Sequence, residues 1–446
     1  MAAVLAPETA EARAEAVAAP PAARHPLLGG WRTLAWVGFA AVLIVAPLVF
    51  DSGASVSFLS QLGTLIIFGL SFNMLLGQGG MLSFGHAVYS GLGGYVAVHV
   101  MNASASGGFF VPVVLIPFVG GFAGLFFGVL LGYVTTKKAG TTFAMITMGI
   151  GELVYACTQM FPRFFGGEGG ITTNRSYGGP FLGFSFGPQI QVYYLIVVWL
   201  LVCAIAMYAF TQTPLGRIAN AVRDNAERAE FIGYDTRRVR YLVLIISTFF
   251  AGISGALAAI NFEIVGAESV SAMRSGDGLL FTFIGGVGSF VGPILGAIAG
   301  GFLTIKLSDY TMAWQLYLGV FFILIVMYAP GGLAAMFSAN WRVLRAGKFA
   351  RVLTSWLAVV AASAVILLGS VIVVELSYAV AFGSQKAATA KFLASLTGGW
   401  NAALWAAGFA LLVGGFWWFA KSRTSFRNDW GVVDAEINAG SNGGAR

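Results

Sequence analysis

Charged side chains are scarce in this sequence. Asp, Glu, Lys and Arg make up only 10% of its 446 residues, whereas about a quarter of the residues of a soluble domain are charged. Hydrophobic residues reach 58% and the mean hydropathy is +0.83. This composition excludes an ordinary soluble domain and predicts a polytopic membrane protein. Its net charge of +7 does not call for nucleic acid as a partner, because cytoplasmic loops of membrane proteins collect Lys and Arg.

The sequence also lacks the residues on which most catalytic and metal sites are built. It has two cysteines and three histidines. Cys157 and Cys203 both lie inside apolar runs, which argues against a disulfide framework or a metal site. No GxxxxGK[ST], HExxH, CxxC or GxSxG pattern occurs, so the chain has no Walker A site of its own and no evident hydrolase nucleophile. We therefore expect no cofactor and no enzymatic activity, and a transport pathway whose energy is supplied by other subunits.

Apolar runs long enough to cross a bilayer recur along the chain. A spanning helix needs about 20 mostly apolar residues. The sequence predicts such helices at residues 34–50, 57–76, 81–101, 111–134, 141–161, 191–210, 241–262, 313–329, 355–378 and 400–420. A further apolar region, residues 270–307, is interrupted by glycines and a proline between 285 and 293, where a single helix cannot continue.

The distribution of basic residues sets the predicted orientation. Arg24 and Arg32 place the N-terminus in the cytoplasm. A basic loop at 337–354 has no acidic neighbour in the sequence and should be cytoplasmic too; it carries Arg342, Arg345, Lys348 and Arg351. Both can be true only if residues 270–307 cross the membrane twice. We therefore expect a permease core at 34–336, two additional spans over 355–420, a disordered cytoplasmic tail at 1–33 and a cytoplasmic tail at 421–446.

The longest run dense in charge, residues 213–240, lies between two apolar segments. Thr213 and Pro214 are typical of a helix N-cap and a first helical position, and Gly233 can adopt the left-handed conformation that ends a helix. Asp235 can then cap the helix that re-enters the apolar region. Apolar residues recur between them at steps of three and four, which predicts one amphipathic helix over 214–232. The stripe is Leu215, Ile218, Val222, Ala226, Ala229 and Ile232, and the expected i,i+4 ion pairs are Arg223 with Glu227 and Asp224 with Arg228. A solvated connecting loop is the alternative interpretation.

This segment resembles the cytoplasmic coupling segment of branched-chain amino-acid ABC permeases of the LivM type. Members typically carry a Gly-Arg, an Arg-Asp-Asn and then a Gly, as Gly216, Arg217, Arg223, Asp224, Asn225 and Gly233 do here. The resemblance implies that the segment docks into a cleft on an ATPase subunit. We add Val222, from the apolar stripe, and Glu230, from the charged face, to the expected coupling residues. The resemblance covers about residues 57–336 and fades after about Met336.

A Gly-rich break at residues 76–95 continues the resemblance. Family members have an Asn-containing helix, a Gly-rich turn, Ser-x-Gly-His and a Gly-Tyr, which match Asn73, Gly77, Gly80, Ser83, Gly85, His86, Gly94 and Tyr95. We take Asn73, Ser83 and His86 as candidates for the translocation path. His86 is either a pH-sensitive or substrate-facing group or a residue that only donates to a backbone carbonyl.

Two further places are path candidates. Glu152, within a GxGE pattern common in the family, is the acidic residue most clearly inside a predicted span, where an unpaired carboxylate is costly. It either serves transport or pairs with another helix or with a partner subunit. The turn that carries Gly286, Gly288 and Ser289 either packs near the path or is a tight corner between helices.

The longest external loop, residues 162–190, carries a third Gly-rich pattern. Gly166, Gly167, Gly170 and Ile171 match the family here, whereas Phe165 stands where Thr is common. We expect the loop to form the outer mouth or to face a binding protein; a flexible external loop is the alternative.

The expected fold is an all-α integral membrane protein, a permease bundle similar to type II ABC importers of the cobalamin class, with about ten spans plus two extra C-terminal spans. The resemblance implies a permease for branched-chain or other small amino acids in a bacterial inner membrane. Its implied partners are a LivH-type permease, two ABC ATPases, an extracytoplasmic substrate-binding protein and the lipid bilayer. Urea or aromatic acids are alternative substrates. The rival interpretation is a secondary transporter or channel that works alone, for which several intramembrane carboxylates or bases would be expected.

Overall fold

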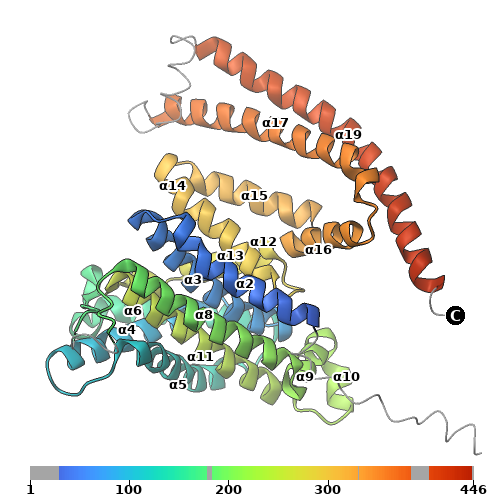
Figure 1. Cartoon of the computed structure of the whole chain (residues 1–446). Coiled ribbons are helices and arrows are strands. Elements are labelled where there is room, and N and C mark those ends of the chain that lie inside the picture. The colour runs from blue at the N-terminus through green and yellow to red at the C-terminus, as the bar shows by residue number, and fades with distance from the viewer. Residues whose placement is uncertain (1–29, 178–182, 330, 383–400, 444–446) are drawn as a thin grey trace, which may run out of the picture. The chain divides into compact units, whose positions relative to one another are not determined.

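The computed structural model describes residues 30–177, 183–329, 331–382 and 401–443 (Figure 1). The chain divides into two units, Met1–Phe50 and Asp51–Arg446. In the first unit the described part is α2 (Gly30–Val49), an apolar helix at the place of the first predicted span. Parts of three predicted segments lie outside the described residues. They are residues 1–29 of the N-terminal tail, residue 400 at the start of the last span, and residues 444–446 of the C-terminal tail.

Long apolar helices that pack side by side form the core of the second unit. They are α3 (Gly53–Asn73), α4 (His86–Ala105), α5 (Ile116–Thr135), α6 (Gly140–Met160), α8 (Gln189–Gln212) and α11 (Thr236–Phe262). α11 packs along α3, α4 and α5. Glycine permits the close approach: a Cβ on Gly93 would lie 2.7 Å from the Cα of Gly252, and a Cβ on Gly120 would lie 2.7 Å from the carbonyl oxygen of Gly252. Small residues at such crossings let helix backbones approach closely in a bilayer.

Short elements fill the connections at one end of these helices. Before α5 lies the single turn η2 (Val113–Leu115); after α6 come α7 (Pro162–Phe165), η3 (Gly167–Gly169) and strand β1 (Ile171–Thr172); after α11 come strand β2 (Ile264–Val265) and η4 (Ala267–Val270). β1 and β2 pair antiparallel, with Ile171 opposite Val265. Arg175 strengthens the link, because its backbone N–H donates to Glu263 Oε1 at 2.9 Å and its guanidinium donates to the Asn261 carbonyl at 3.2 Å. The long loop after α6 is therefore attached to the end of α11.

The helix of the Gly-rich region is interrupted where the sequence predicts a turn. α12 (Ala272–Gly285) ends at the start of this turn, and α13 (Gly292–Gly301) begins at its end. Gly286 has a φ of +110°, which other residues rarely adopt. The two short helices pack against each other and against α3. The predicted break is confirmed; that each half crosses the membrane stays a prediction. The chain continues through η5 (Phe302–Lys306), α14 (Leu307–Tyr310), α15 (Trp314–Tyr328) and α16 (Gly332–Arg345).

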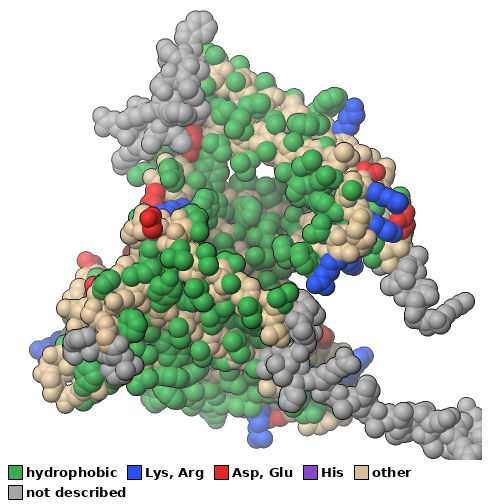
Figure 2. Space-filling view, in the orientation of Figure 1, with side chains coloured by type: hydrophobic (Ala, Val, Ile, Leu, Met, Phe, Trp, Pro, Cys, Tyr) green, Lys and Arg blue, Asp and Glu red, His purple; other side chains and the backbone are tan. Residues whose placement is uncertain are grey.

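Apart from the two short strands, the secondary-structure elements of the described residues are all helices, which confirms the all-α fold class. By length and apolar composition seven described helices can cross a membrane, or eight if α15 and α16, bent by 53°, form one span. α2, α4, α12 and α13 occupy other predicted spans but do not meet the same criterion, so the count of twelve stays a prediction. Hydrophobic side chains cover most of the face that Figure 2 shows, with charged side chains in a few small groups.

The C-terminal region is a pair of long helices that pack against each other, α17 (Phe349–Phe382) and α19 (Asn401–Gly443). The predicted tail after residue 420 continues the helix of α19. The basic loop also differs from expectation, because its residues find acidic partners far along the chain. Arg342 pairs with Asp434 at 3.1 Å, and Lys348 pairs with Glu436 at 2.7 Å. The Lys348 ammonium, helped by a nearby guanidinium, lowers the pKa of the Glu436 carboxyl.

Candidate functional site

The coupling segment, residues 213–240, forms two short helices rather than the single predicted one. They are α9 (Pro214–Asp224) and α10 (Ala226–Phe231). Thr213 caps α9 as predicted, accepting a hydrogen bond from the Gly216 N–H at 3.2 Å. The prediction of one helix is wrong at Asn225, which is extended (φ −159°, ψ 98°) and accepts from the Arg228 N–H at 2.9 Å. Asn side chains compete in this way with the helical backbone bonds.

The break at Asn225 changes the charge pairing of the segment. The predicted i,i+4 pairs do not form, since their members lie on different helices. Instead Arg223 pairs with its neighbour Asp224 at 2.8 Å. The end of the segment agrees with the sequence: Gly233 has a φ of +92°, and Asp235 caps α11 by accepting from the Arg238 N–H at 3.0 Å. That hydrogen bond lowers the pKa of the Asp235 carboxyl.

The apolar stripe of the segment is divided between two surroundings. Val222 and Ala229 are buried within the chain, at 5% and 2% exposure. α9 packs against α8, α11 and the turn that follows α3. Phe231 and Ile232, in contrast, are 89% and 67% exposed. Most of the stripe therefore attaches the segment to its own bundle, and the exposed apolar surface lies at the end of α10.

The coupling segment contacts η1 (Met74–Gln78), a π-helical turn that follows α3. The Arg223 guanidinium donates to the Gly77 carbonyl, and the Asn220 amide donates to Gln78 Oε1 at 2.8 Å. π turns of this kind are frequent at functional sites. The contact joins the two stretches that carry most of the family resemblance.

The same turn touches the Gly-rich break between α12 and α13. Asn73 Nδ2 donates to the Ser289 carbonyl at 3.3 Å, and a Cβ on Gly77 would lie 2.7 Å from the Val287 carbonyl oxygen. Asn73, Gly286 and Ser289, predicted separately as path candidates, thus lie in one region close to α9. Gly288 borders open space, since a Cβ there would meet nothing within 4 Å.

Two other candidates, His86 and Ser83, are enclosed in the bundle. His86 has 0% exposure, and its ring centroid lies 5.3 Å from that of Phe72 and 5.5 Å from that of Phe68. Its Nε2 lies 3.0 Å from the Ser71 hydroxyl, so its partner is a hydroxyl and not the backbone carbonyl considered above. Ser83 is also buried, and its hydroxyl has no hydrogen-bond partner among the described residues. Their role in the path stays a prediction.

Glu152 lies on the exposed face of α6. No described residue forms an ion pair with it. α6 is the least enclosed of the long helices of the second unit that precede α9: only Phe143, Ala144, Thr147, Gly151 and Thr158 are buried. In the isolated chain this carboxylate therefore faces outward, away from the packed interior that holds His86.

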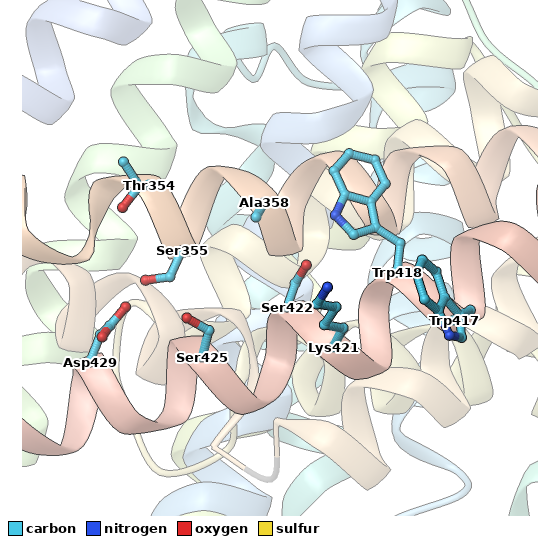
Figure 3. A pocket seen from close by; sticks show the side chains of 9 residues that line it. All are labelled: Thr354, Ser355, Ala358, Trp417, Trp418, Lys421, Ser422, Ser425 and Asp429. Carbon is cyan, nitrogen blue, oxygen red and sulfur yellow. The ribbon is translucent and has the colours of Figure 1, made fainter.

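Two cavities lie elsewhere. One, of about 510 Å³, runs between α17 and α19, lined by Thr354, Ser355, Ala358, Trp417, Trp418, Lys421, Ser422, Ser425 and Asp429 (Figure 3). It includes none of the path candidates. The other, of about 610 Å³, is lined by residues of α4, α6 and α11 and by the segment from β2 to η4, and it includes Arg274, Glu168 and Glu268. The residues that line this second cavity come from segments far apart in the chain, so the sequence could not predict it. The only related signals were the Gly-rich external loop and an Arg within an apolar region.

The apolar helices of this bundle are broken at two Gly-rich turns that contact each other. An amphipathic segment is attached at the same place. This arrangement defines a membrane transport subunit rather than an enzyme. The model of the family "Branched-chain amino acid transport system / permease component" matches residues 55–331, more than half of the chain. The chain belongs to this family and is a multi-pass protein of the inner membrane.

Two curated relatives agree with this assignment, and a third carries a different name. The high-affinity branched-chain amino acid permease protein LivM of Escherichia coli is 28% identical over 292 residues, which cover 61% of this chain and 68% of that protein. LivM of Salmonella typhimurium is 27% identical over 320 residues, 66% of this chain and 74% of that protein. The ribose import permease RbsC of Haemophilus influenzae is 24% identical over 309 residues, 65% of this chain and 88% of that protein. No solved structure matches the chain.

Proposed function

We propose that this chain is the permease subunit of an ATP-driven importer for branched-chain or other small amino acids. It forms the translocation path with a second, LivH-type permease, and two ABC ATPases bind the cytoplasmic side. An extracytoplasmic binding protein delivers the substrate. Both termini are cytoplasmic, as the basic residues predict. Membership of the branched-chain family and two LivM relatives support the substrate class.

The observation that carries the proposal is the contact between Arg223 and Gly77. It connects the coupling segment to η1, and η1 in turn touches the Gly-rich turn through Asn73 and Ser289. Movement of α9 by an ATPase would thus reach two broken helices directly. Such coupling requires that each site favours one of two arrangements of the same packed elements.

The exposed end of α10 supplies the surface for the ATPase. Phe231 and Ile232 form a small apolar patch; Glu230 is exposed next to them in the sequence, and Arg217 is exposed on α9. Buried aromatic anchors commonly carry most of the energy of an interface. We assign docking to this patch and fold stability to Val222; Gly216, Asp224, Asn225 and Gly233 shape the segment between them.

Glu152 fits a role at the surface between the two permeases, because it is exposed on α6. A carboxylate on a lipid-facing helix is costly, so a polar partner or a hydrated path is expected to cover it. Gly286, Gly288 and Ser289 then line the inner part of the path, whereas Ser83 and His86 stabilise the helices that border it.

Co-purification tests the proposal. The chain, expressed with its gene neighbours, should form a complex with an ATPase, and reconstituted complexes should take up leucine only with ATP and the binding protein. Uptake of urea or an aromatic acid in place of leucine would change the substrate that we assign. The ribose permease among the relatives shows that a similar permease can carry a different substrate. Uptake by the chain alone would replace the proposal with a secondary transporter or channel.

A further inference from the structure

The cavity of about 610 Å³ lies at the end of the bundle away from α9 and α10. α11 begins beside α10 and ends at Phe262, which lines this cavity. We propose that the cavity is a substrate-binding site inside a single permease chain, in which Arg274 receives the carboxylate of a small aliphatic amino acid. The inference rests on the function proposed above and adds to it a place where the permease itself holds its cargo.

Arg274 is the group that selects a carboxylate. It lies on the first turns of α12, and its guanidinium carbon lies 5.8 Å from the ring centroid of Phe68. Within the described chain no carboxylate is at ion-pair distance from this guanidinium, although Asp277 lies one turn further along the same helix. A cation inside an apolar bundle is costly unless it meets water or an anion. A planar guanidinium with free donors binds a carboxylate through two parallel hydrogen bonds.

The other walls suit the remainder of an amino acid. Part of the lining is apolar, including Ala258, Phe262 and Val265, and can accept an aliphatic side chain. Two exposed carboxylates, Glu168 and Glu268, also line the cavity and offer a counter-charge to an ammonium group. Small-molecule sites usually have volumes of about 300–1,000 Å³ and combine apolar walls with a few polar groups.

The helices around this cavity are closely packed, and the loop that borders it is fixed in place. A Cβ on Gly255 of α11 would overlap the Ser90 carbonyl oxygen of α4, and one on Gly91 would overlap Val270 and the Ser269 backbone, so glycine lets the walls approach one another here. The segment that carries Glu168 is attached through β1, and the Thr173 N–H donates to the Glu263 carbonyl at 2.9 Å. An ordered wall reduces the loss of conformational freedom that binding would otherwise require.

Protection from a thiol reagent tests the site. In the assembled transporter, with Cys157 and Cys203 replaced by Ala, Ser269→Cys places a thiol in the cavity wall. Its labelling by N-ethylmaleimide is measured with L-leucine, with 4-methylpentanoate, which lacks the ammonium, and with 3-methylbutylamine, which lacks the carboxylate. We expect leucine and 4-methylpentanoate to slow labelling at least threefold, and the amine to have little effect.

Substitution of the arginine makes the test specific. Arg274→Gln should weaken protection by leucine about tenfold or more, which is the scale of a lost hydrogen bond to a charged group, and Arg274→Lys should retain part of it. Arg163→Gln is the control, because Arg163 is exposed on α7 and does not line the cavity. If Ser269→Cys prevents insertion, Ala258→Cys on α11 serves as the reporter.

The outcomes separate this inference from the proposed function. Labelling unchanged by leucine, in a complex that still imports leucine with ATP, would overturn the binding site and leave the function standing. Protection by leucine that persists in Arg274→Gln would overturn the role of Arg274. Protection by 4-methylpentanoate without any leucine uptake would show a carboxylate site and overturn its assignment to amino acids.

Discussion

Arg223 donates a hydrogen bond to the carbonyl of Gly77, a residue 146 positions earlier in the chain. The guanidinium comes from the coupling segment, and the carbonyl belongs to the π turn that ends α3. A Cβ on Gly80 would lie 3.2 Å from the Arg223 Cβ, so the arginine also packs against the backbone after that turn. Attachment of the coupling segment to the bundle thus depends on this side chain and on glycines opposite it.

Arg223→Gln should weaken the coupling between the ATPase and the translocation path. The shorter neutral side chain loses a charge-assisted hydrogen bond, typically about 1.5–3 kcal/mol, while the helices of the bundle keep their packing. Substrate-stimulated ATPase activity and uptake by reconstituted complexes should fall about tenfold. Arg163→Gln, exposed on α7 and outside the coupling segment, is the matched control and should keep parental rates. Equal rates for both variants would mean that the Arg223 contact carries no coupling.

Phe231→Ser should weaken binding of the ATPase without disturbing the chain. The side chain is 89% exposed, so its loss costs the fold little, but an aromatic anchor at an interface commonly contributes about 2 kcal/mol or more. The amount of ATPase that co-purifies reports the effect. Normal co-purification of Phe231→Ser would place docking elsewhere on the segment.

Val222→Asp should act differently, through the fold. Val222 is buried, and a charge in its place loses packing and requires desolvation, at a cost of several kcal/mol. We expect lower thermal stability of the detergent-solubilised chain, measured before any ATPase is added. A stable Val222→Asp chain that only fails to bind the ATPase would instead return Val222 to the docking surface.

A cysteine at Ala346 tests the orientation. Ala346 follows α16, is exposed, and lies among the basic residues that predict the cytoplasmic side. In the Cys157→Ala, Cys203→Ala background, a membrane-impermeant maleimide should label it in inside-out vesicles and not in intact cells. Labelling from outside would mean that α12 and α13 do not both cross the membrane.

Removal of the chain after Arg351 should leave uptake measurable, because the family match ends at residue 331. The structure adds a cost to that expectation. Tyr317 of α15 donates to the buried Glu375 of α17 at 3.2 Å, and Val343 is buried in a cluster with Val352 and Val433. The truncated protein should therefore melt at a lower temperature while transporting. Loss of all uptake at normal insertion levels would show that α17 and α19 belong to the working core.

Local signals in the sequence identified the ends of the coupling segment. Thr213, Gly233 and Asp235 act through neighbours a few residues away, so residue type and spacing were enough to predict them. Asn225 carries a similar signal as an N-cap, but the run of apolar residues around it favoured an uninterrupted helix. The two Gly-rich breaks were also predicted, since glycine and proline limit helices wherever they occur.

Contacts between distant segments could not be predicted from the sequence. Nothing near Arg342 or Lys348 indicates that Asp434 and Glu436 would neutralise them, and the surroundings of Arg274 come from five helices and two loops. Whether a candidate faces inward or outward was equally hidden: His86 and Glu152 looked alike as ionisable residues in apolar runs, yet one is fully buried and the other exposed. Such differences arise from packing, which a single sequence does not encode locally.

The π turn η1 holds one residue more at the end of α3 than an α-helical turn would. An α-helix advances about 100° per residue, so a change of η1 from π to α geometry would rotate its last residues by up to about a third of a revolution around the axis of α3. Asn73, the last residue of α3, bonds to the Gly-rich turn, and Gly77, inside η1, accepts from Arg223. The coupling segment therefore holds the end of α3 at a turn that has a second helical geometry available to it.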